Sequence, residues 1–259
     1  MAEVVVPTAW VADRRESVRI VDVRDGWEFD GIGHVPGAVN VPFDAFRSEF
    51  EGEAGHLPGA DVFADLMAEA GVRNDDRLVA YDDTHGVFAA RFLVTAELYG
   101  HDPSLLHLLD GDFSAWQREY ETTTGTESFE PSTYEAVFDA SGPLVGMEAV
   151  QDAVDDPETV VVDTREAWEY DEGHIPGSVQ IDWRDLVDDE SRGLKPEADL
   201  REILESRDVG PDRRVLLYCN TARRISHTYT VLRHLGYGDL AFYEGSLTEW
   251  EREGGTIET

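Results

Sequence analysis

The segment IVDVRDGWEFDGIGHVPGAVNV, from Ile20 to Val41, recurs later in the same chain. Its second copy is VVDTREAWEYDEGHIPGSVQI, from Val161 to Ile181. The matching positions pair Asp22 with Asp163, Arg24 with Arg165, Trp27 with Trp168, Glu28 with Glu169 and His34 with His174. Matches in the same order at one long offset indicate a duplicated domain, because solenoid repeats recur every ~20 to 50 residues.

Two further pairs of segments continue the duplication. LVAYDD, from Leu78 to Asp83, aligns with VLLYCN, from Val215 to Asn220. DGDFSAW, from Asp110 to Trp116, aligns with EGSLTEW, from Glu244 to Trp250. The repeat therefore extends through both halves of the chain.

The 259 residues are enough for two domains of roughly 130 residues each. The stretch from Glu121 to Pro143 is rich in Thr, Ser and Gly and has weak periodicity, which is typical of a connecting segment. We therefore predict a first domain over residues 1–122, a linker over residues 123–143 and a second domain over residues 144–259.

Within each copy, short apolar runs alternate with helical patterns. The sequence predicts strands at Val18–Val23, Leu78–Tyr81, Thr159–Asp163 and Val215–Tyr218. It predicts helices at Asp61–Ala70, Val87–Tyr99, Leu200–Arg207 and Ile225–Leu235. This alternation predicts an α/β fold of two tandem domains, each with a mainly parallel sheet flanked by helices.

The composition is strongly acidic, with 55 Asp and Glu against 21 Lys and Arg and a formal net charge of -34. Such a balance argues against nucleic acid and against an anionic membrane surface as partners, because both require clustered basic side chains. Lys195 is the only lysine, a composition typical of proteins from salt-rich cytoplasm. An ordinary acidic cytosolic protein is the alternative.

Cys219 is the only cysteine, so the fold cannot depend on an internal disulfide. The first residues lack a basic stretch followed by a long apolar run, and no apolar run reaches the ~18 residues that span a bilayer. We therefore expect a protein of the reducing cytoplasm. The scattered histidines and the single cysteine predict no metal site, and no cofactor or oligomeric state is predicted.

The only cysteine directly follows the apolar run VLLY, at the carboxyl end of a predicted strand. Ligands of open α/β sheets bind at this edge. A helix should begin near Arg224 or Ile225, and its N-terminus, together with Arg223 and Arg224, would stabilise a thiolate. A cysteine after an apolar strand can equally be an inert core residue.

Comparison of the two copies favours a functional cysteine. The residue that aligns with Cys219 is Asp82, within YDDTHG. A buried thiol of the core would be exchanged for another apolar residue, so the aspartate indicates that both loops face solvent or a cleft. It also indicates that the first copy has lost its nucleophile. Nothing in the first copy repeats Arg223 and Arg224, and Arg91 aligns with either His227 or Thr228.

Residues that occur in both copies are predicted to be structural. Asp163 and Arg165 should form a pair at a strand end, although Arg165 could also line the active site. His34 and His174 should fix a turn within H-x-P-G rather than act in catalysis. The repeated tryptophans are predicted to be packing anchors: Trp27, Trp168, Trp116 and Trp250. His227 is predicted to be an exposed residue of a helix.

On these motifs the chain resembles the rhodanese family, specifically the two-domain thiosulfate and 3-mercaptopyruvate sulfurtransferases. The motifs that carry the resemblance are VDVR and VDTR, GHVPGA and GHIPGS, and the YC loop before a helix. The resemblance implies two rhodanese domains, of which only the C-terminal one carries a catalytic cysteine. Asp82 at the cysteine position fits this pattern.

The resemblance further implies a persulfide formed on Cys219 and passed to a thiophilic acceptor such as cyanide or a thiol. The partners would then be a small-molecule sulfur donor and acceptor. The substrate-binding residues would be those of the loop and the strand end: Asn220, Thr221, Ala222, Arg223, Arg224 and Arg165. The persulfide would be held by N–H groups of this loop.

The loop reads Cys-Asn-Thr-Ala-Arg-Arg and has no glycine, unlike the usual loops of these enzymes. Two arginines favour thiosulfate as the donor over 3-mercaptopyruvate, because guanidinium groups bind oxyanions well. A cysteine phosphatase is an alternative, but its Cys-x5-Arg spacing would place arginine where Ile225 stands. A non-catalytic sulfur-relay or binding module is the third possibility.

Overall fold

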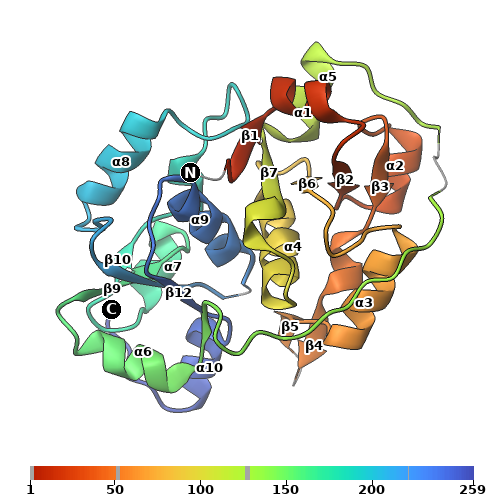
Figure 1. The fold of residues 1–259 in the computed structure, drawn as a ribbon. Coiled ribbons are helices and arrows are strands. Elements are labelled where there is room, and N and C mark those ends of the chain that lie inside the picture. The colour runs from red at the N-terminus through yellow and green to blue at the C-terminus, as the bar shows by residue number, and fades with distance from the viewer. Residues whose placement is uncertain (1–2, 51–52, 126–128, 221) are drawn as a thin grey trace. The chain divides into compact units, whose positions relative to one another are not determined.

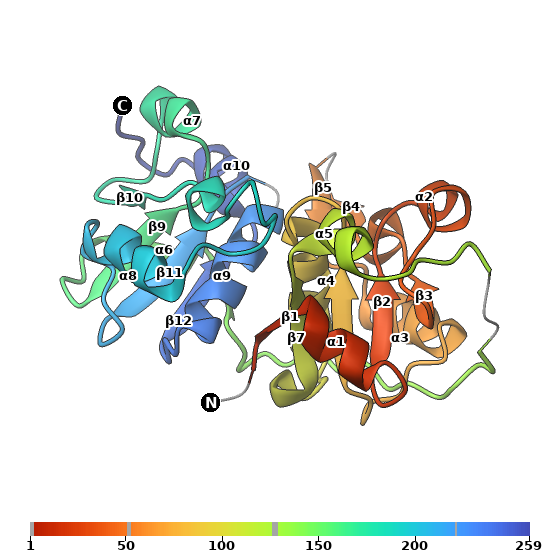
Figure 2. The ribbon, with the colours of Figure 1, turned by 90° about the horizontal axis from the view of Figure 1, so that it is seen from above.

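The computed structural model describes residues 3–50, 53–125, 129–220 and 222–259. They form two compact units, drawn in Figures 1 and 2. Unit 1 comprises Met1–Ala140 and Asp188–Leu194, and unit 2 comprises Ser141–Val187 and Lys195–Thr259. The predicted α/β class is confirmed, since each unit holds a five-stranded parallel sheet flanked by helices.

In unit 1 the sheet has the order β1-β7-β6-β2-β3. Its strands are β1 (Val5–Pro7), β2 (Arg19–Asp22), β3 (Ala38–Asn40), β6 (Leu78–Tyr81) and β7 (Leu106–Asp110). Its helices are α1 (Thr8–Arg14), α2 (Gly26–Gly31), α3 (Ala60–Glu69), α4 (Val87–Leu98) and α5 (Asp112–Glu119). Short 3-10 helices lie at η1 (Phe43–Phe46) and η2 (Pro103–Leu105), and β4 (Ser48–Phe50) pairs antiparallel with β5 (Glu53–His56).

The sheet of unit 2 has the order β10-β9-β11-β12-β8, which repeats the topology of unit 1. Its strands are β8 (Leu144–Val145), β9 (Thr159–Asp163), β10 (Val179–Gln180), β11 (Arg214–Tyr218) and β12 (Leu240–Tyr243). Its helices are α6 (Met147–Val154), α7 (Ala167–Glu172), α8 (Glu197–Glu205), α9 (Arg223–His234), α10 (Ser246–Arg252) and the 3-10 helix η3 (Trp183–Leu186). The sequence repeat is therefore a repeat of the whole fold.

Each sheet is buried on both faces, which explains why its strands are nearly continuous apolar runs. Along β6, Leu78 and Ala80 join the core formed with α3 and α4, whereas Val79 and Tyr81 join the core formed with α1, α2 and α5. Helices thus cover both faces of the sheet, as Figure 2 shows. Parallel strands place their carboxyl ends at one edge, where the loops leading into α4 and α9 begin.

A buried ion pair recurs at the same edge of each sheet. Arg24 and Asp22 lie 2.6 Å apart in unit 1, and Arg165 and Asp163 lie 2.6 Å apart in unit 2. Each arginine also donates to a glycine carbonyl at 2.7 Å, that of Gly33 or Gly173. The predicted pairing of Asp163 with Arg165 is present.

The repeated histidines also have structural contacts. His34 exchanges backbone hydrogen bonds with Thr123, and His174 does so with Glu258. The His34 ring stacks on Phe29 at 3.5 Å, and the His174 ring stacks on Tyr170 at 3.7 Å. These contacts tie the H-x-P-G turn to the last segment of each copy, as expected for turn-fixing residues.

Two predictions about aromatic residues are wrong. Trp27 and Trp168 are 66% and 58% exposed, so they do not anchor a core; each indole N–H instead donates to a carboxylate two residues before it. His227, predicted to be exposed, is fully buried, because nearly every residue of α9 around it packs inward. Trp116 and Trp250 are buried as predicted.

Most of the stretch predicted as a linker packs along unit 1. Ser132 donates its N–H to Ala68 O at 2.9 Å, Val137 donates to Tyr99 O at 3.0 Å, and Tyr134 is buried in the core with α3. The boundary between the units lies after Ala140. None of the described helices has the length and apolar character needed to cross a membrane.

Candidate active site

Cys219 lies where β11 ends, and its side chain is fully buried. The helix α9 begins at Arg223, earlier than predicted, so Arg223 and Arg224 belong to the first helical turn. The early start is possible because Ala222, the N-cap residue, takes a left-handed conformation with φ 59°. Thr221 lies outside the described residues. The missing loop glycine is thus replaced by an alanine in a conformation that costs about 1–2 kcal/mol.

The backbone of Cys219 is hydrogen-bonded to the first residues of α10, the helix that follows the neighbouring strand β12. Its N–H donates to Ser246 Oγ at 3.3 Å, and its carbonyl accepts the N–H of Leu247 at 3.1 Å. The Ser246 hydroxyl in turn donates to Tyr243 O at 3.0 Å. Because β11 and β12 are adjacent and in register, the start of α10 meets the loop after β11. Sequence reasoning missed Ser246, although the repeat of DGD and EGS marked its position.

A carboxylate that the sequence did not place near the loop pairs with one of its two arginines. Arg224 Nη1 donates to Glu169 Oε2, and Asn220 Nδ2 donates to Glu169 Oε1 at 3.0 Å. Glu169 is only 9% exposed. Burial acts to lower the pKa of Arg224, but the hydrogen bond and charge of Glu169 outweigh burial and raise it, with a smaller contribution from Cys219. Arg224 is therefore a paired cation close to Cys219.

The corresponding loop of unit 1 holds an anion of its own. Asp82 Oδ1 accepts the N–H groups of Thr84 at 2.6 Å and Gly86 at 2.9 Å. Its Oδ2 accepts those of Phe88 at 2.8 Å and Ala89 at 2.9 Å. Burial raises the pKa of Asp82, and the N–H groups act in the opposite direction. Asp82 is 1% exposed, so its side chain does not face solvent or a cleft, whereas Thr84 in the same loop is exposed.

The two loops can now be aligned by their helices. Gly86, with φ 83°, precedes α4 as Ala222 precedes α9, and both helices have 12 residues. The fifth residues of these helices are Arg91 and His227, so His227 is the counterpart of Arg91. The loop of unit 1 is one residue longer. The equivalent strand-to-helix turns therefore surround a carboxylate, that of Asp82, in unit 1 and begin with a buried thiol, that of Cys219, in unit 2.

The segment Asp188–Leu194, which belongs to unit 1, covers the ends of β6 and β7. Arg192 Nε donates to both carboxylate oxygens of Asp112, at 2.9 and 3.0 Å, and Arg192 Nη2 donates to Asp83 O at 3.1 Å. The N–H of Leu194 donates to Asp110 Oδ1 at 2.8 Å. This segment therefore contacts the residues that follow β6 and β7.

Arg165 lies one strand away from Cys219, at the end of β9. Its guanidinium donates to both oxygens of Asp163 and to Gly173 O, as Arg24 does in unit 1. Burial acts to lower the pKa of Arg165, but the hydrogen bond and charge of Asp163 raise it overall. These contacts hold the end of β9 to the segment around Gly173, which is a structural role for Arg165.

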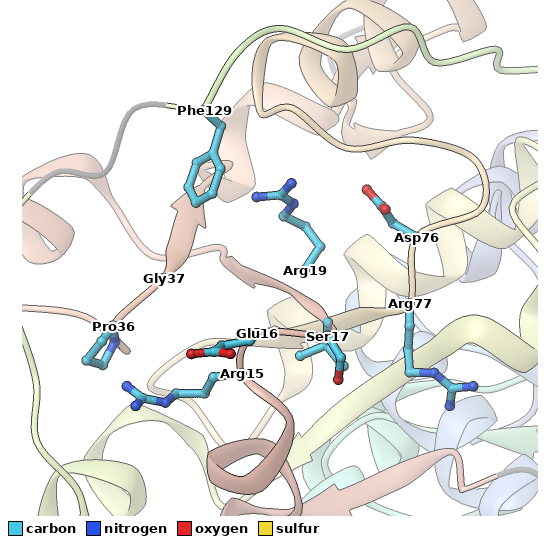
Figure 3. Close-up of a pocket in the computed structure, with 10 residues that line it drawn as sticks. Arg15, Glu16, Ser17, Arg19, Pro36, Gly37, Asp76, Arg77 and Phe129 are labelled. Carbon is cyan, nitrogen blue, oxygen red and sulfur yellow. The ribbon is translucent and has the colours of Figure 1, made fainter.

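A cavity of about 610 Å³ lies in unit 1 at the amino ends of β2 and β6, the opposite edge from Asp82. Figure 3 shows Arg19 beneath Phe129, with Arg15 and Glu16 near Pro36. The Arg19 guanidinium lies 4.2 Å from the centre of the Phe129 ring. This cavity contains no residue of the Cys219 loop. Over the described ranges, no group of three or more metal-binding side chains is present.

Comparisons with known proteins agree with this geometry. The Rhodanese-like domain model matches residues 7–119 and 147–253. The chain is 31% identical to a thiosulfate sulfurtransferase of Pseudomonas aeruginosa, covering 84% of this chain and 82% of the relative. It is 28% identical to the sulfur carrier protein TtuD of Thermus thermophilus, covering 96% and 93%.

Among solved structures, the chain is similar to SseA of Escherichia coli, described as a 3-mercaptopyruvate sulfotransferase with a rhodanese fold. The TM-score is 0.82 at 24% identity, covering 93% of this chain and 98% of that one. This likeness extends over both units. With two domain matches that together span most of the sequence, the chain belongs to the rhodanese family as a tandem of two rhodanese-like domains.

Proposed function

We propose that this protein is a sulfurtransferase that moves sulfane sulfur from thiosulfate to a thiophilic acceptor through a persulfide on Cys219. The observation that carries the proposal is the position of Cys219 at the end of β11, facing the start of α9. At the matching position of unit 1, a strand-to-helix turn binds a carboxylate through four N–H groups. A turn of this kind suits an anionic sulfur.

The reaction needs two displacements. The Cys219 thiolate attacks the outer sulfur of thiosulfate, the bond between the two sulfurs breaks, and sulfite leaves with the electron pair. The new persulfide carries its negative charge on the terminal sulfur. Cyanide or an acceptor thiolate then attacks that sulfur, which breaks the persulfide bond and restores the thiolate. Neither step requires a metal or cofactor.

The N–H groups at the start of α9 would stabilise the terminal sulfur. The first helical N–H groups have no partner within the helix, and the helix dipole favours negative charge there. Asn220, Ala222, Arg223 and Arg224 supply the described part of this turn. A reducing cytoplasm would keep the cysteine available as a thiol.

Thiosulfate is the proposed donor because curated relatives at 31% identity carry the name thiosulfate sulfurtransferase and because two arginines lie in the first turn of α9. One observation favours 3-mercaptopyruvate as a second candidate. Glu169 pairs with Arg224, which lowers the net positive charge and suits a monoanion better than two unpaired arginines would.

The test is an intact mass measurement after incubation with thiosulfate, followed by cyanide. We expect a mass increase of one sulfur atom, which cyanide removes as thiocyanate. Cys219→Ser should show neither the increase nor turnover. Turnover that survives in Cys219→Ser would contradict the proposal.

Assays with other substrates separate the alternatives. A persulfide that forms but does not turn over with cyanide or thiols would identify a sulfur-relay module. Hydrolysis of an aryl phosphate that disappears in Cys219→Ser would identify a phosphatase. Faster turnover with 3-mercaptopyruvate than with thiosulfate would exchange the donor and leave the mechanism in place.

A further inference from the structure

Glu169 and its counterpart Glu28 share one structural task. Each is the third residue of its helix, α7 or α2, and each accepts the backbone N–H of the N-cap residue. The distances are 3.0 Å from Glu166 N to Glu169 Oε2 and 3.2 Å from Asp25 N to Glu28 Oε2. This reciprocal cap stabilises the helix start in both copies.

Glu169 has a second set of contacts that Glu28 lacks. It accepts hydrogen bonds from Asn220 and from Arg224, which lie 51 and 55 residues further along the chain. The counterpart of Asn220 is Asp83, which is not a donor, and α4 begins with Val87 and Phe88 instead of arginines. Within the described part of unit 1, Glu28 therefore has no loop partner.

These contacts join the carboxylate to both sides of the cysteine loop. Asn220 is the residue after Cys219, and Arg224 lies in the first turn of α9. The Arg224 side chain is 20% exposed and Glu169 is nearly buried, so their charges interact with less screening than a surface pair. Removal of the carboxylate would take away the hydrogen-bonded anion of Arg224 and make the surroundings of Cys219 more positive.

We propose that Glu169 is a positioning residue that clamps the Cys219 loop and sets the net charge that an incoming anion meets there. Its effect on donors rests on the proposed function: the carboxylate would make the site less selective for dianions. The clamp and the charge effect can be tested without any donor, because Cys219 is the only cysteine in the chain.

The test compares alkylation of Cys219 by iodoacetate and by iodoacetamide in Glu169→Gln and in the matched control Glu28→Gln. In both reactions the thiolate forms a carbon–sulfur bond and iodide leaves. The reagents differ in charge, so the ratio of their rates reports the local potential. Loosening of the loop alone raises both rates and leaves the ratio unchanged.

We expect the ratio of iodoacetate to iodoacetamide rates to rise about threefold or more in Glu169→Gln, as loss of one nearby charge in a partly screened site implies. Glu28→Gln, which makes the same change at the equivalent cap position, should keep the wild-type ratio. A Glu169→Gln ratio equal to that of wild type would overturn the proposal.

A second variant keeps the test decisive if Glu169→Gln folds poorly. Arg224→Gln removes the cation that pairs with Glu169, so its ratio should fall below that of wild type. In the double variant the two changes of charge have opposite sign, so its ratio should return towards that of wild type. A double variant with a ratio as high as that of Glu169→Gln alone would show that Arg224 does not supply the positive charge near Cys219 and would contradict the proposal.

Steady-state kinetics with thiosulfate test the effect of Glu169 on the reaction. Glu169→Gln should lower kcat with thiosulfate, because the loop is less well held, while KM for this dianion falls. Glu28→Gln should change neither constant, and equal kinetics in the two variants would overturn the positioning role. If wild-type protein forms no persulfide, the proposed function fails, whereas the alkylation ratios still decide the role of Glu169.

Discussion

The carboxylate of Asp82 should be a major source of stability for unit 1, and Asp82→Asn tests this directly. The side chain accepts four backbone N–H groups, two on each oxygen, and is 1% exposed. Asparagine has the same shape but keeps only one oxygen. Its NH2 group would face two N–H donors, which would lose the oxygen that accepts them.

The expected cost follows from those two N–H groups. Each buried donor left without an acceptor costs about 1–3 kcal/mol, so two cost about 2–6 kcal/mol. Part of this is offset because asparagine does not bury a charge, and burial raises the pKa of Asp82. We therefore expect a loss of about 3 kcal/mol, which corresponds to a melting temperature lower by roughly 6–12 °C for a unit of this size.

The assay is urea unfolding followed by circular dichroism, with hydrogen exchange at the amides of Thr84, Gly86, Phe88 and Ala89. These amides should exchange faster in Asp82→Asn. The matched control is Asp83→Asn, because Asp83 is 32% exposed at its side chain, accepts one backbone N–H, from Ser114, and forms only a partly exposed ion pair with Arg192 at 3.5 Å. We expect the control to cost less than about 1 kcal/mol. A loss below about 1 kcal/mol in Asp82→Asn, with unchanged exchange, would refute the reasoning.

Three other predictions follow from the same structure. Burial lowers the pKa values of His101 and His107, so the native state binds fewer protons than the unfolded state. Their contribution, complete above the unfolded value of about 6.5, should be lost as pH falls, and a urea midpoint that does not decrease from pH 7.5 to pH 5.5 would contradict this. The net charge of -34 should make added KCl raise the melting temperature by screening repulsion, and a flat response to salt would contradict that. Ser246→Ala removes the hydroxyl that accepts the buried N–H of Cys219, so it should destabilise unit 2 by about 1–3 kcal/mol. A urea midpoint equal to that of wild type would contradict this prediction.

Local patterns in the sequence are sufficient to predict the main strands and helices and their duplication. The strand β9 was predicted with the observed bounds, Thr159–Asp163, because a buried parallel strand is recognisable as a short apolar run. The helix α4 was predicted to within one residue, since Gly100 ends its apolar pattern. The repeat of Ile20–Val41 predicted two domains of one topology. These features depend on neighbouring residues in one segment, which the sequence displays directly.

The sequence was less informative where side chains from distant segments meet. The repeat placed Trp27 and Trp168 at equivalent positions but could not decide that both face solvent. The comparison of Cys219 with Asp82 identified the site, although it suggested an open loop where four N–H groups enclose the carboxylate. A residue type does not reveal which backbone groups surround it.

From the sequence alone follow the duplication, the parallel α/β class and a single thiol at the end of a strand, because each depends on the order of residues along one stretch of chain. Only the tertiary structure joins Glu169 to Asn220 and Arg224, across more than 50 residues of sequence. It also joins the N–H of Cys219 to the hydroxyl of Ser246 and buries His227. Such contacts arise when β9, β11 and β12 are packed side by side, and that adjacency determines the charge and the hydrogen bonds around the cysteine.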